Sequence, residues 1–199
     1  MGGVYFGRNF LGVITRPYET YRRLTKEHHW GELVYLGVLV IGYFALASLV
    51  KTAAFRPFLL TRQFVVLFGM TVVTVGLTIG LLLSLGKVVG GQGSGKGVLF
   101  GWLYTLIPTT VWFLATSILY VLIPPPRSTS AAGIIFSVLY LVFSLSMFFW
   151  KLTLGYLTLR FSLKLDLPRI LVVAGIAGPI MGLYSLLMYR WGIFKVPFI

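Results

Sequence analysis

The chain lacks cysteine and has very few acidic residues. Its 199 residues include no Cys and only 4 Asp and Glu. Without cysteine it can form no disulfide, no thiolate metal site and no thiol nucleophile. Charged residues make up 11% of the chain and hydrophobic residues 58%, whereas soluble domains carry about 25% charged residues. This shortage of charge excludes an ordinary soluble domain and predicts an integral membrane protein.

The charge that is present is mostly positive, with 17 Lys and Arg residues and a formal net charge of +13. In a soluble protein this excess would suggest nucleic acid as a partner. Between apolar spans it is typical of inner loops that face anionic lipid. We therefore expect a bilayer with anionic headgroups as a partner, and no nucleic acid. The residues assigned to the headgroups at the inner face are Arg22, Arg23, Lys26, Lys87, Lys96, Arg160 and Lys164.

Uncharged apolar stretches recur along the chain at lengths that can cross a bilayer. No connection between them is long enough to hold a soluble domain. The predicted fold is therefore all-α: a polytopic integral membrane protein of five transmembrane helices in one membrane domain, residues 1–199. The expected spans are about 33–50, 64–85, 98–123, 132–150 and 169–189.

The N-terminal segment contains no apolar run of the length that a cleavable signal peptide needs. Pro17 is a residue type favoured at the first position of a helix. Tyr18, Tyr21 and Leu24 then form a narrow apolar edge beside basic residues. The pattern predicts a short amphipathic helix in the membrane interface over residues 15–27; the alternative is a solvated basic tail.

The fourth apolar run continues beyond Trp150 and is too long for one perpendicular crossing. We expect the span to end at Trp150 and to be followed by a tilted or interfacial extension that carries Lys151, Arg160 and Lys164. A lysine deep in a span would mark a transport path. Beside Trp150, Lys151 is instead expected to snorkel to the interface. Asp166 is the expected N-cap of the last helix.

Five spans place the two termini on opposite sides of the membrane. With the N-terminus inside, the inner segments carry eleven of the 17 basic residues and the outer segments carry six. The positive-inside rule therefore predicts an internal N-terminus and an external C-terminus. In a prokaryote the membrane concerned would be the cytoplasmic membrane.

Residues 90–97 resemble a phosphate-binding loop. Gly90, Gly95 and Lys96 match the pattern G-x-x-x-x-G-K-[ST], but Gly97 stands where the magnesium-binding hydroxyl should be. Such a loop also needs a preceding strand in a soluble sheet, and here a membrane helix precedes it. We therefore predict a flexible cationic turn at the inner face, with no bound nucleotide.

The one cluster of metal-ligand residue types is His28, His29 and Glu32. Zinc sites use three or four protein ligands, and no second histidine-bearing segment exists. With Trp30 between them, these residues are expected to anchor the chain at the interface. No catalytic constellation is found, so we expect a protein that is not an enzyme and has no metal and no cofactor.

Two stripes of small residues at a spacing of four would let other helices approach closely. These helix-packing residues are Gly76, Gly80 and Ser84 in the second span, and Ala174, Gly178 and Gly182 in the fifth. They predict packing against partner membrane proteins or self-association.

The third span contains Pro108, which removes a backbone donor and predicts a kink. A freed carbonyl and the phenol of Tyr104 would then lie within the membrane. Thr74 and Thr78 add hydroxyls in the second span. These four residues are the candidate functional kink or cavity.

Several of these segments resemble a known family. Residues 15–22 (TRPYETYR) are similar to a P-x-x-T-Y/F opening, and residues 93–95 (GSG) and 150–152 (WKL) also fit. Tyr104 and Pro108 match a G-Y-x-x-x-P run, with Leu103 in place of its glycine. The chain thereby resembles a prokaryotic-type, five-span member of the Yip (Ypt-interacting protein) domain family, without the long N-terminal extension and D-L-Y-G-P signature of eukaryotic members. The resemblance implies a non-enzymatic membrane factor; eukaryotic relatives engage Rab GTPases and other family members.

The predicted function is that of a non-enzymatic membrane scaffold or interaction protein in membrane organisation or trafficking-like processes. The alternative is a small transporter, channel or lipid-moving protein with a cavity near the kinked third span. Proline-kinked helices and hydroxyl groups in the spans motivate that alternative.

Overall fold

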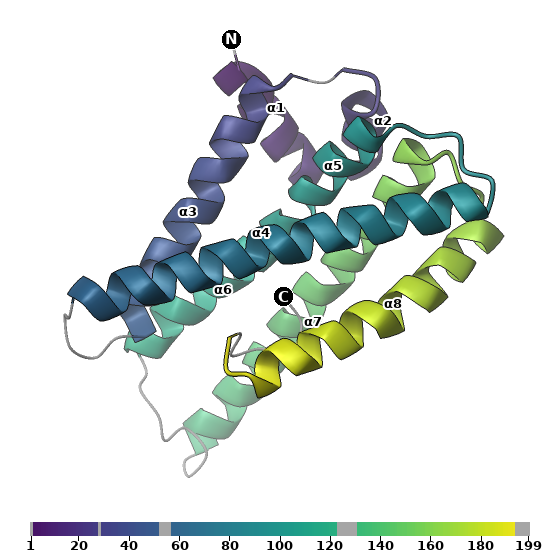
Figure 1. Ribbon diagram of the computed structural model, residues 1–199. Coiled ribbons are helices and arrows are strands. Elements are labelled where there is room, and N and C mark those ends of the chain that lie inside the picture. The colour runs from purple at the N-terminus through teal and green to yellow at the C-terminus, as the bar shows by residue number, and fades with distance from the viewer. Residues whose placement is uncertain (1, 28, 52–56, 123–130, 194–199) are drawn as a thin grey trace.

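The computed structural model describes residues 2–27, 29–51, 57–122 and 131–193, and within these ranges it contains helices and turns but no strand. The predicted all-α class is confirmed. The helices are α1 (Gly2–Thr15), α2 (Pro17–Leu24), α3 (Gly31–Lys51), α4 (Pro57–Val88), α5 (Gly95–Tyr104), α6 (Leu106–Leu122), α7 (Ala131–Ser162) and α8 (Leu167–Arg190) (Figure 1).

Four segments are long and apolar enough to cross a membrane: Phe64–Val88, Gly95–Thr116, Gly133–Ser162 and Leu167–Arg190. The apolar part of α3, Gly31–Ala45, is shorter. Each corresponds to one of the five expected spans. The end of the third expected span, residue 123, lies outside the described residues.

The N-terminal region holds one helix that was predicted and one that was not. α2 begins at Pro17, with Arg16 as its N-cap residue, and ends at Leu24, so it is shorter than the predicted 15–27. α1 precedes it because Phe6, Phe10 and Val13 share one helical face, which packs on the core. α1 and α2 lie together at one end of the molecule (Figure 1).

The predicted kink in the third span is present as a break between α5 and α6 at Thr105. The ring of Pro108 excludes the carbonyl four residues earlier, that of Tyr104, and supplies no N–H for it. Thr105 instead bonds to the preceding turn of α5: its N–H (3.0 Å) and its hydroxyl (2.6 Å) both donate to the carbonyl of Trp102. Pro179 lies inside α8, which continues through it without a break.

The fourth span was expected to end at Trp150, but the helix that contains this residue continues beyond it. α7 is a single helix of 32 residues, and the apolar segment Gly133–Ser162 includes Lys151. No proline interrupts this stretch, and Gly155 alone is tolerated inside a helix. Lys151 therefore lies inside one continuous apolar helix, and its expected place at the membrane interface stays a prediction.

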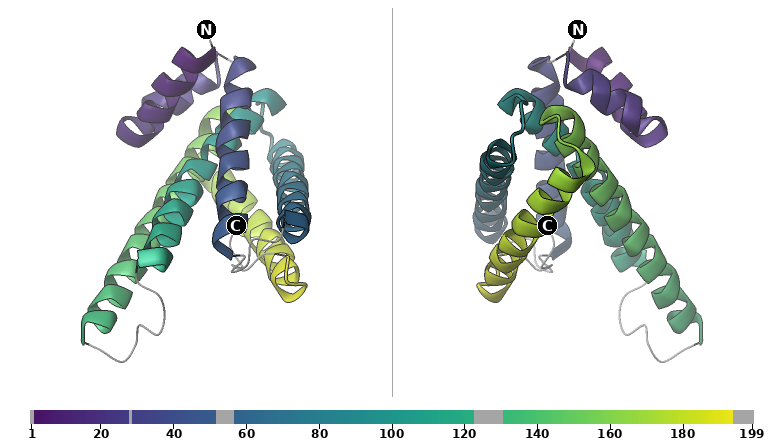
Figure 2. Two further views of the ribbon diagram at one scale, coloured as in Figure 1. Left: turned by 90° about the vertical axis from the view of Figure 1, so that its left-hand side faces the viewer. Right: turned by 90° about the vertical axis from the view of Figure 1, so that its right-hand side faces the viewer.

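The long helices form two arms that diverge from one end of the molecule (Figure 2). α6 and α7 make one arm, α4 and α8 the other, with α3 between them. The buried core is concentrated where the arms converge on α1, α2 and α5. Its central residues are Val13, Tyr21, Leu24, Tyr104, Ile107, Leu154, Val98, Leu163 and Val173.

The glycine turn before α5 is packed on the turn between α7 and α8. Gly90 adopts a left-handed φ of 86°, and the N–H of Gln92 donates to the carbonyl of Leu163 at 3.1 Å. Gly93 lies so close to the carbonyl of Ser162 that no side chain would fit there. Lys164 takes a left-handed φ of 54° to close the facing turn. These contacts join the predicted cationic turn to the start of α8.

Candidate functional site

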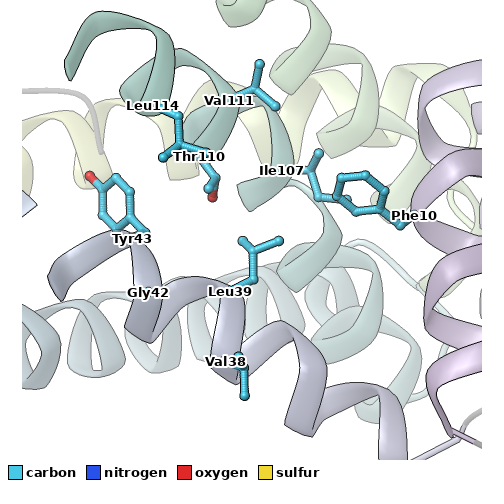
Figure 3. Close-up of a pocket in the computed structure, with 9 residues that line it drawn as sticks. All are labelled: Phe10, Val38, Leu39, Gly42, Tyr43, Ile107, Thr110, Val111 and Leu114. Atoms are coloured by element: carbon cyan, nitrogen blue, oxygen red, sulfur yellow. The ribbon is translucent and has the colours of Figure 1, made fainter. Parts of the chain in front are cut away.

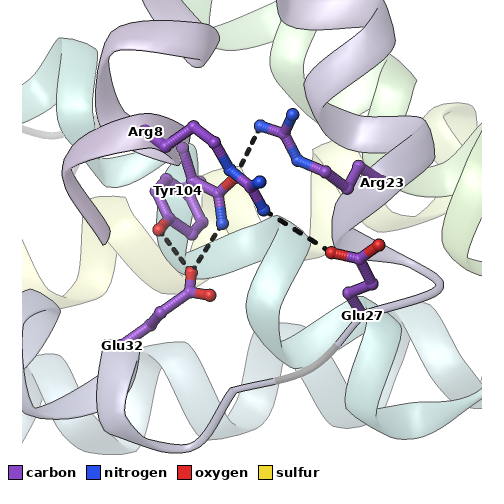
Figure 4. A network of polar contacts seen from close by, with 6 residues as sticks. Arg8, Arg23, Glu27, Glu32 and Tyr104 are labelled. Atoms are coloured by element: carbon purple, nitrogen blue, oxygen red, sulfur yellow. Dashed lines mark hydrogen bonds and ion pairs between the residues drawn. The ribbon is translucent and has the colours of Figure 1, made fainter. Parts of the chain in front are cut away.

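The most unusual group in the chain is a buried carboxylate at the start of α3. Glu32 is 1% exposed, although it stands in the first turn of the helix. Its Oε2 accepts hydrogen bonds from the phenol of Tyr104 at 2.7 Å and from the side-chain amide of Asn9 at 2.9 Å (Figure 4). A buried charge is costly unless it is paired or hydrogen-bonded, and these two donors come from α5 and α1.

The network continues to a guanidinium in α2. Arg23 donates to the carbonyl oxygen of the Asn9 side chain at 2.7 Å, so Asn9 links the cation of Arg23 to the carboxylate of Glu32. Beside it, Arg8 and Glu27 form an ion pair at 3.5 Å (Figure 4). Arg23 was expected at the lipid headgroups, and here its guanidinium makes a hydrogen bond within the protein. Four helices are thus joined through one polar cluster.

Two atoms of this cluster are not satisfied by any described group. The Oε1 of Glu32 and the Nε of Arg23 are buried and have no hydrogen-bond partner within residues 2–27, 29–51, 57–122 and 131–193. One is an acceptor and the other is a donor. The network therefore depends on the few bonds that it does make, and the loss of any one would leave a polar group unpaired.

A second polar contact attaches α2 to the bundle. Tyr21 is fully buried, and its phenol donates to the carbonyl of Gly101 at 3.1 Å. Burial raises the pKa of the Tyr21 phenol well above its usual range. The apolar edge predicted for this helix is therefore used in part for core packing: Tyr21 and Leu24 are buried, whereas Tyr18 is 52% exposed and rests edge-on against Phe161.

Glu32 was weighed from the sequence only as part of a metal cluster. Its partner Asn9 is the only asparagine in the chain, and it lies three residues beyond Phe6 on the buried face of α1. A lone amide on an apolar face, together with an acid just before an uncharged stretch, is the signal that could have identified the pair. Which acid met which amide depended on how the helices pack.

His29 and Glu32, the described members of the metal-ligand cluster, have other contacts. His29 stacks on the ring of Tyr5 at 3.8 Å between centroids, Glu32 points into the polar network, and His28 lies outside the described residues. Among the residues that the structure describes, no three His, Cys, Asp or Glu side chains gather in one place.

The four residues of the candidate kink or cavity are not brought together. Tyr104 and Pro108 lie at the break in the third span, whereas Thr74 and Thr78 pack α4 against α8. The hydroxyls of Thr74 and Thr78 each donate to a carbonyl of their own helix at 2.7 Å. They also contact Tyr184 at 3.1 Å and Met181 at 3.7 Å, respectively.

A separate cavity of about 210 Å³ lies between α3 and α6 (Figure 3). Its lining is almost entirely apolar, and the hydroxyl of Thr110 is already bonded to the carbonyl of Leu106 at 2.9 Å. Neither the phenol of Tyr104 nor the threonines of α4 reach it. The lining residues are Phe10, Val38, Leu39, Gly42, Tyr43, Ile107, Thr110, Val111 and Leu114.

The two small-residue stripes face away from the rest of the chain. A Cβ added at Gly76, Gly80, Gly178 or Gly182 would meet no atom within 4 Å. Ser84 and Ala174 are exposed on the same faces. The contacts between α4 and α8 are made on the opposite, threonine-bearing side of α4, so the chain does not use these stripes for its own packing.

Exposed basic residues gather at the end where the arms converge. Lys96 lies over the ring of Trp30 at 5.7 Å, and Arg160 donates to the phenol of Tyr156 at 2.7 Å. The N-terminal helices, the glycine turn and the start of α8 all meet there (Figure 1). The remaining residues of the predicted headgroup set, Arg22, Lys26, Lys87 and Lys164, are also exposed.

Comparison with known proteins gives one family match. The Yip1 domain matches residues 11–189, which is most of the chain. No curated protein and no solved structure matches significantly. The match includes α2, α3 and α5 of the polar network and nearly all of the candidate spans, whereas Asn9 in α1 lies before its first residue. The family is implicated in membrane trafficking and is generally non-enzymatic. The chain is therefore an integral membrane protein that belongs to the Yip1 domain family.

Proposed function

We propose that this protein is a prokaryotic-type, five-span scaffold that has no enzymatic activity and packs against partner membrane proteins or a second copy of itself. The observation that carries this proposal is the outward orientation of the two small-residue stripes. Space is open above Gly76, Gly80, Gly178 and Gly182. In lipid, helices associate through close packing of small residues rather than through the hydrophobic effect.

The proposed topology places the N-terminus inside and the C-terminus outside. It is supported by the gathering of α1, α2, the glycine turn and the α7–α8 turn at one end, together with exposed basic residues such as Lys87 and Lys164. Basic residues at the inner surface meet anionic headgroups favourably. The buried network around Glu32 then holds α1 and α2 at that surface as a fixed part of the scaffold.

The transport alternative has no comparable support. That alternative placed a cavity near the kinked third span, with Tyr104, Pro108, Thr74 and Thr78 as its candidate residues. These residues lie in two different places, and the cavity between α3 and α6, which Ile107 and Thr110 line beside Pro108, is apolar. A polar solute would gain little there.

Replacing Gly80 by Leu tests the scaffold proposal. The new side chain meets open space within the chain, so folding should be preserved while close approach of a partner helix is blocked. Self-association in liposomes, measured by cross-linking at several protein-to-lipid ratios, should fall. Val72→Leu is the matched control, since Val72 is 56% exposed on the same helix and already carries a branched side chain.

Self-association that is equal for wild type, Gly80→Leu, Gly178→Leu and Val72→Leu would contradict pairing of two copies through the stripes. Partner binding in the native membrane would then be compared for the same variants. Equal recovery of every partner would contradict the scaffold proposal as a whole.

A further inference from the structure

Lys151 lies deep within a candidate membrane span. It stands about four residues from the midpoint of the apolar segment Gly133–Ser162. Nine residues separate it from the exposed Arg160 near the inner end of α7, or about 13 Å along the helix axis. The half-thickness of the hydrocarbon core is about 15 Å. With the segment centred in the hydrocarbon core, Lys151 lies about 5 Å from the mid-plane and about 10 Å from the nearer edge of the core.

The register between helices places Lys151 beside the break in the third span. The indole of Trp112 in α6 donates to the hydroxyl of Ser144 in α7 at 2.8 Å, and Gly101 in α5 lies against Thr158 of α7. Lys151 is midway between Ser144 and Thr158, so it lies at the level of the break at Thr105. The negative end of the α5 dipole partly stabilises a cation there, but it supplies no full counter-charge.

None of the four acidic side chains forms an ion pair with this lysine. Glu19 and Glu27 lie opposite Arg16 and Arg8 at 3.8 and 3.5 Å. Glu32 is bonded to Tyr104 and Asn9, and Asp166 stands at the start of α8 beside the inner turn. These four are all the acidic side chains in the sequence. All four acidic residues lie at the end where the arms converge. A second copy of the chain, inserted in the same orientation, would therefore not bring an acidic side chain to the depth of Lys151.

We propose that Lys151 is the docking point for a transmembrane helix of a different protein that carries an Asp or Glu at mid-bilayer depth. Ionisable residues within a membrane occur paired with one another or facing polar groups, and a partner carboxylate is the group that neutralises a lysine at this depth. Lys151 is partly exposed, so α5 and α6 do not enclose its side chain completely. The inference rests on the proposed scaffold function and names one class of partner for it.

A designed model helix provides the test. The full chain carries no cysteine, so a single Cys at Val88, which is 83% exposed, takes a donor fluorophore. The labelled chain is reconstituted in phosphatidylcholine liposomes with an acceptor-labelled polyleucine helix that has one central Glu, or Gln in its place. Energy transfer should show association about tenfold stronger with the Glu helix than with the Gln helix.

Substitutions at Lys151 test whether the preference for the Glu helix depends on the charge of this lysine. Lys151→Met should abolish the preference for the Glu helix, while Lys164→Met, which removes the same charge at the exposed turn, should keep it. Lys151→Glu should reverse the preference and favour a model helix with a central Lys. This charge exchange keeps the test informative if one variant folds poorly.

Equal association of wild type with the Glu and Gln helices would overturn the inference, and so would a preference that survives Lys151→Met. The first result would mean that the lysine is satisfied by lipid headgroups or by its own helices. The outcome is separate from that of the Gly80→Leu experiment: loss of self-association there together with no preference here would leave the scaffold proposal standing and remove the docking point.

Discussion

The phenol of Tyr104 donates a 2.7 Å hydrogen bond to Oε2 of Glu32, across 72 residues of sequence. It joins the last residue of α5, at the break caused by Pro108, to the first turn of α3. Asn9 donates to the same oxygen and carries the network to Arg23. One carboxylate oxygen thus connects the kinked span to the N-terminal helices, and this relationship defines the first two predictions.

Replacing Tyr104 by Phe should destabilise the protein while leaving the packing volume nearly unchanged. A buried carboxylate oxygen loses one of its two donors, which should cost about 1.5–3 kcal/mol of unfolding free energy. Unfolding of the purified protein in mixed detergent micelles measures the effect. Tyr140→Phe is the control, because the Tyr140 phenol makes no hydrogen bond to any described residue. An equal effect of the two substitutions would show that the Tyr104 bond contributes nothing.

Substitutions at Glu32 should differ according to whether an acceptor remains. Glu32→Gln keeps a carbonyl oxygen for Tyr104 and Asn9, whereas Glu32→Leu leaves both donors buried and unpaired, at about 1–3 kcal/mol each. We expect Glu32→Leu to loosen the N-terminal helices, so that trypsin cleaves at the exposed Arg22 faster than in Glu32→Gln. Identical cleavage rates in the two variants would rule out a role for the network in holding α1 and α2.

Adding a methyl group at Gly93 should disrupt the contact between the glycine turn and the α7–α8 turn. Its Cβ would overlap the carbonyl of Ser162, and both are backbone segments that cannot move independently. Overpacking of this kind costs about 1–3 kcal/mol. Gly95→Ala is the control, since its Cβ would lie 3.5 Å from Leu83 in ordinary contact. Thermal unfolding in detergent should separate the two variants, and equal midpoints would contradict the packed turn.

The buried phenol of Tyr21 predicts a loss of stability in alkaline solution. Burial raises its pKa in the folded protein above the unfolded value of about 10. The folded protein therefore keeps its full stability below pH 10 and loses stability above it. Above pH 10 the Tyr21 phenol ionises in the unfolded chain, which stabilises that state, while the buried phenol of the folded protein stays neutral. Tyr21→Phe should therefore lose less stability than wild type between pH 9 and pH 11, each compared with its own value at pH 8. Parallel pH dependences would contradict burial of this phenol.

Much of the fold follows from local pattern. The uncharged stretches predicted the long apolar helices, and Pro108 predicted the break between α5 and α6, because a proline removes a backbone donor wherever it stands. The helix over Gly2–Thr15 was missed because glycines and polar residues interrupt its short apolar face, which is recognised only once it packs on the core. The chain beyond Trp150 has no residue that stops a helix, so α7 continues through Lys151 to Ser162.

By itself, the sequence determined the class of the molecule. The chain has 58% hydrophobic residues, and its uncharged stretches are long enough to cross a bilayer as helices. A helix satisfies its backbone polar groups within the segment itself, so such stretches can be recognised from composition and length. Only the tertiary structure decided that Glu32, Asn9, Tyr104 and Arg23 meet, and that Lys151 finds no acid in its own chain. Hydrogen bonds and ion pairs depend on distances of a few ångströms between distant segments, and no local pattern specifies those distances.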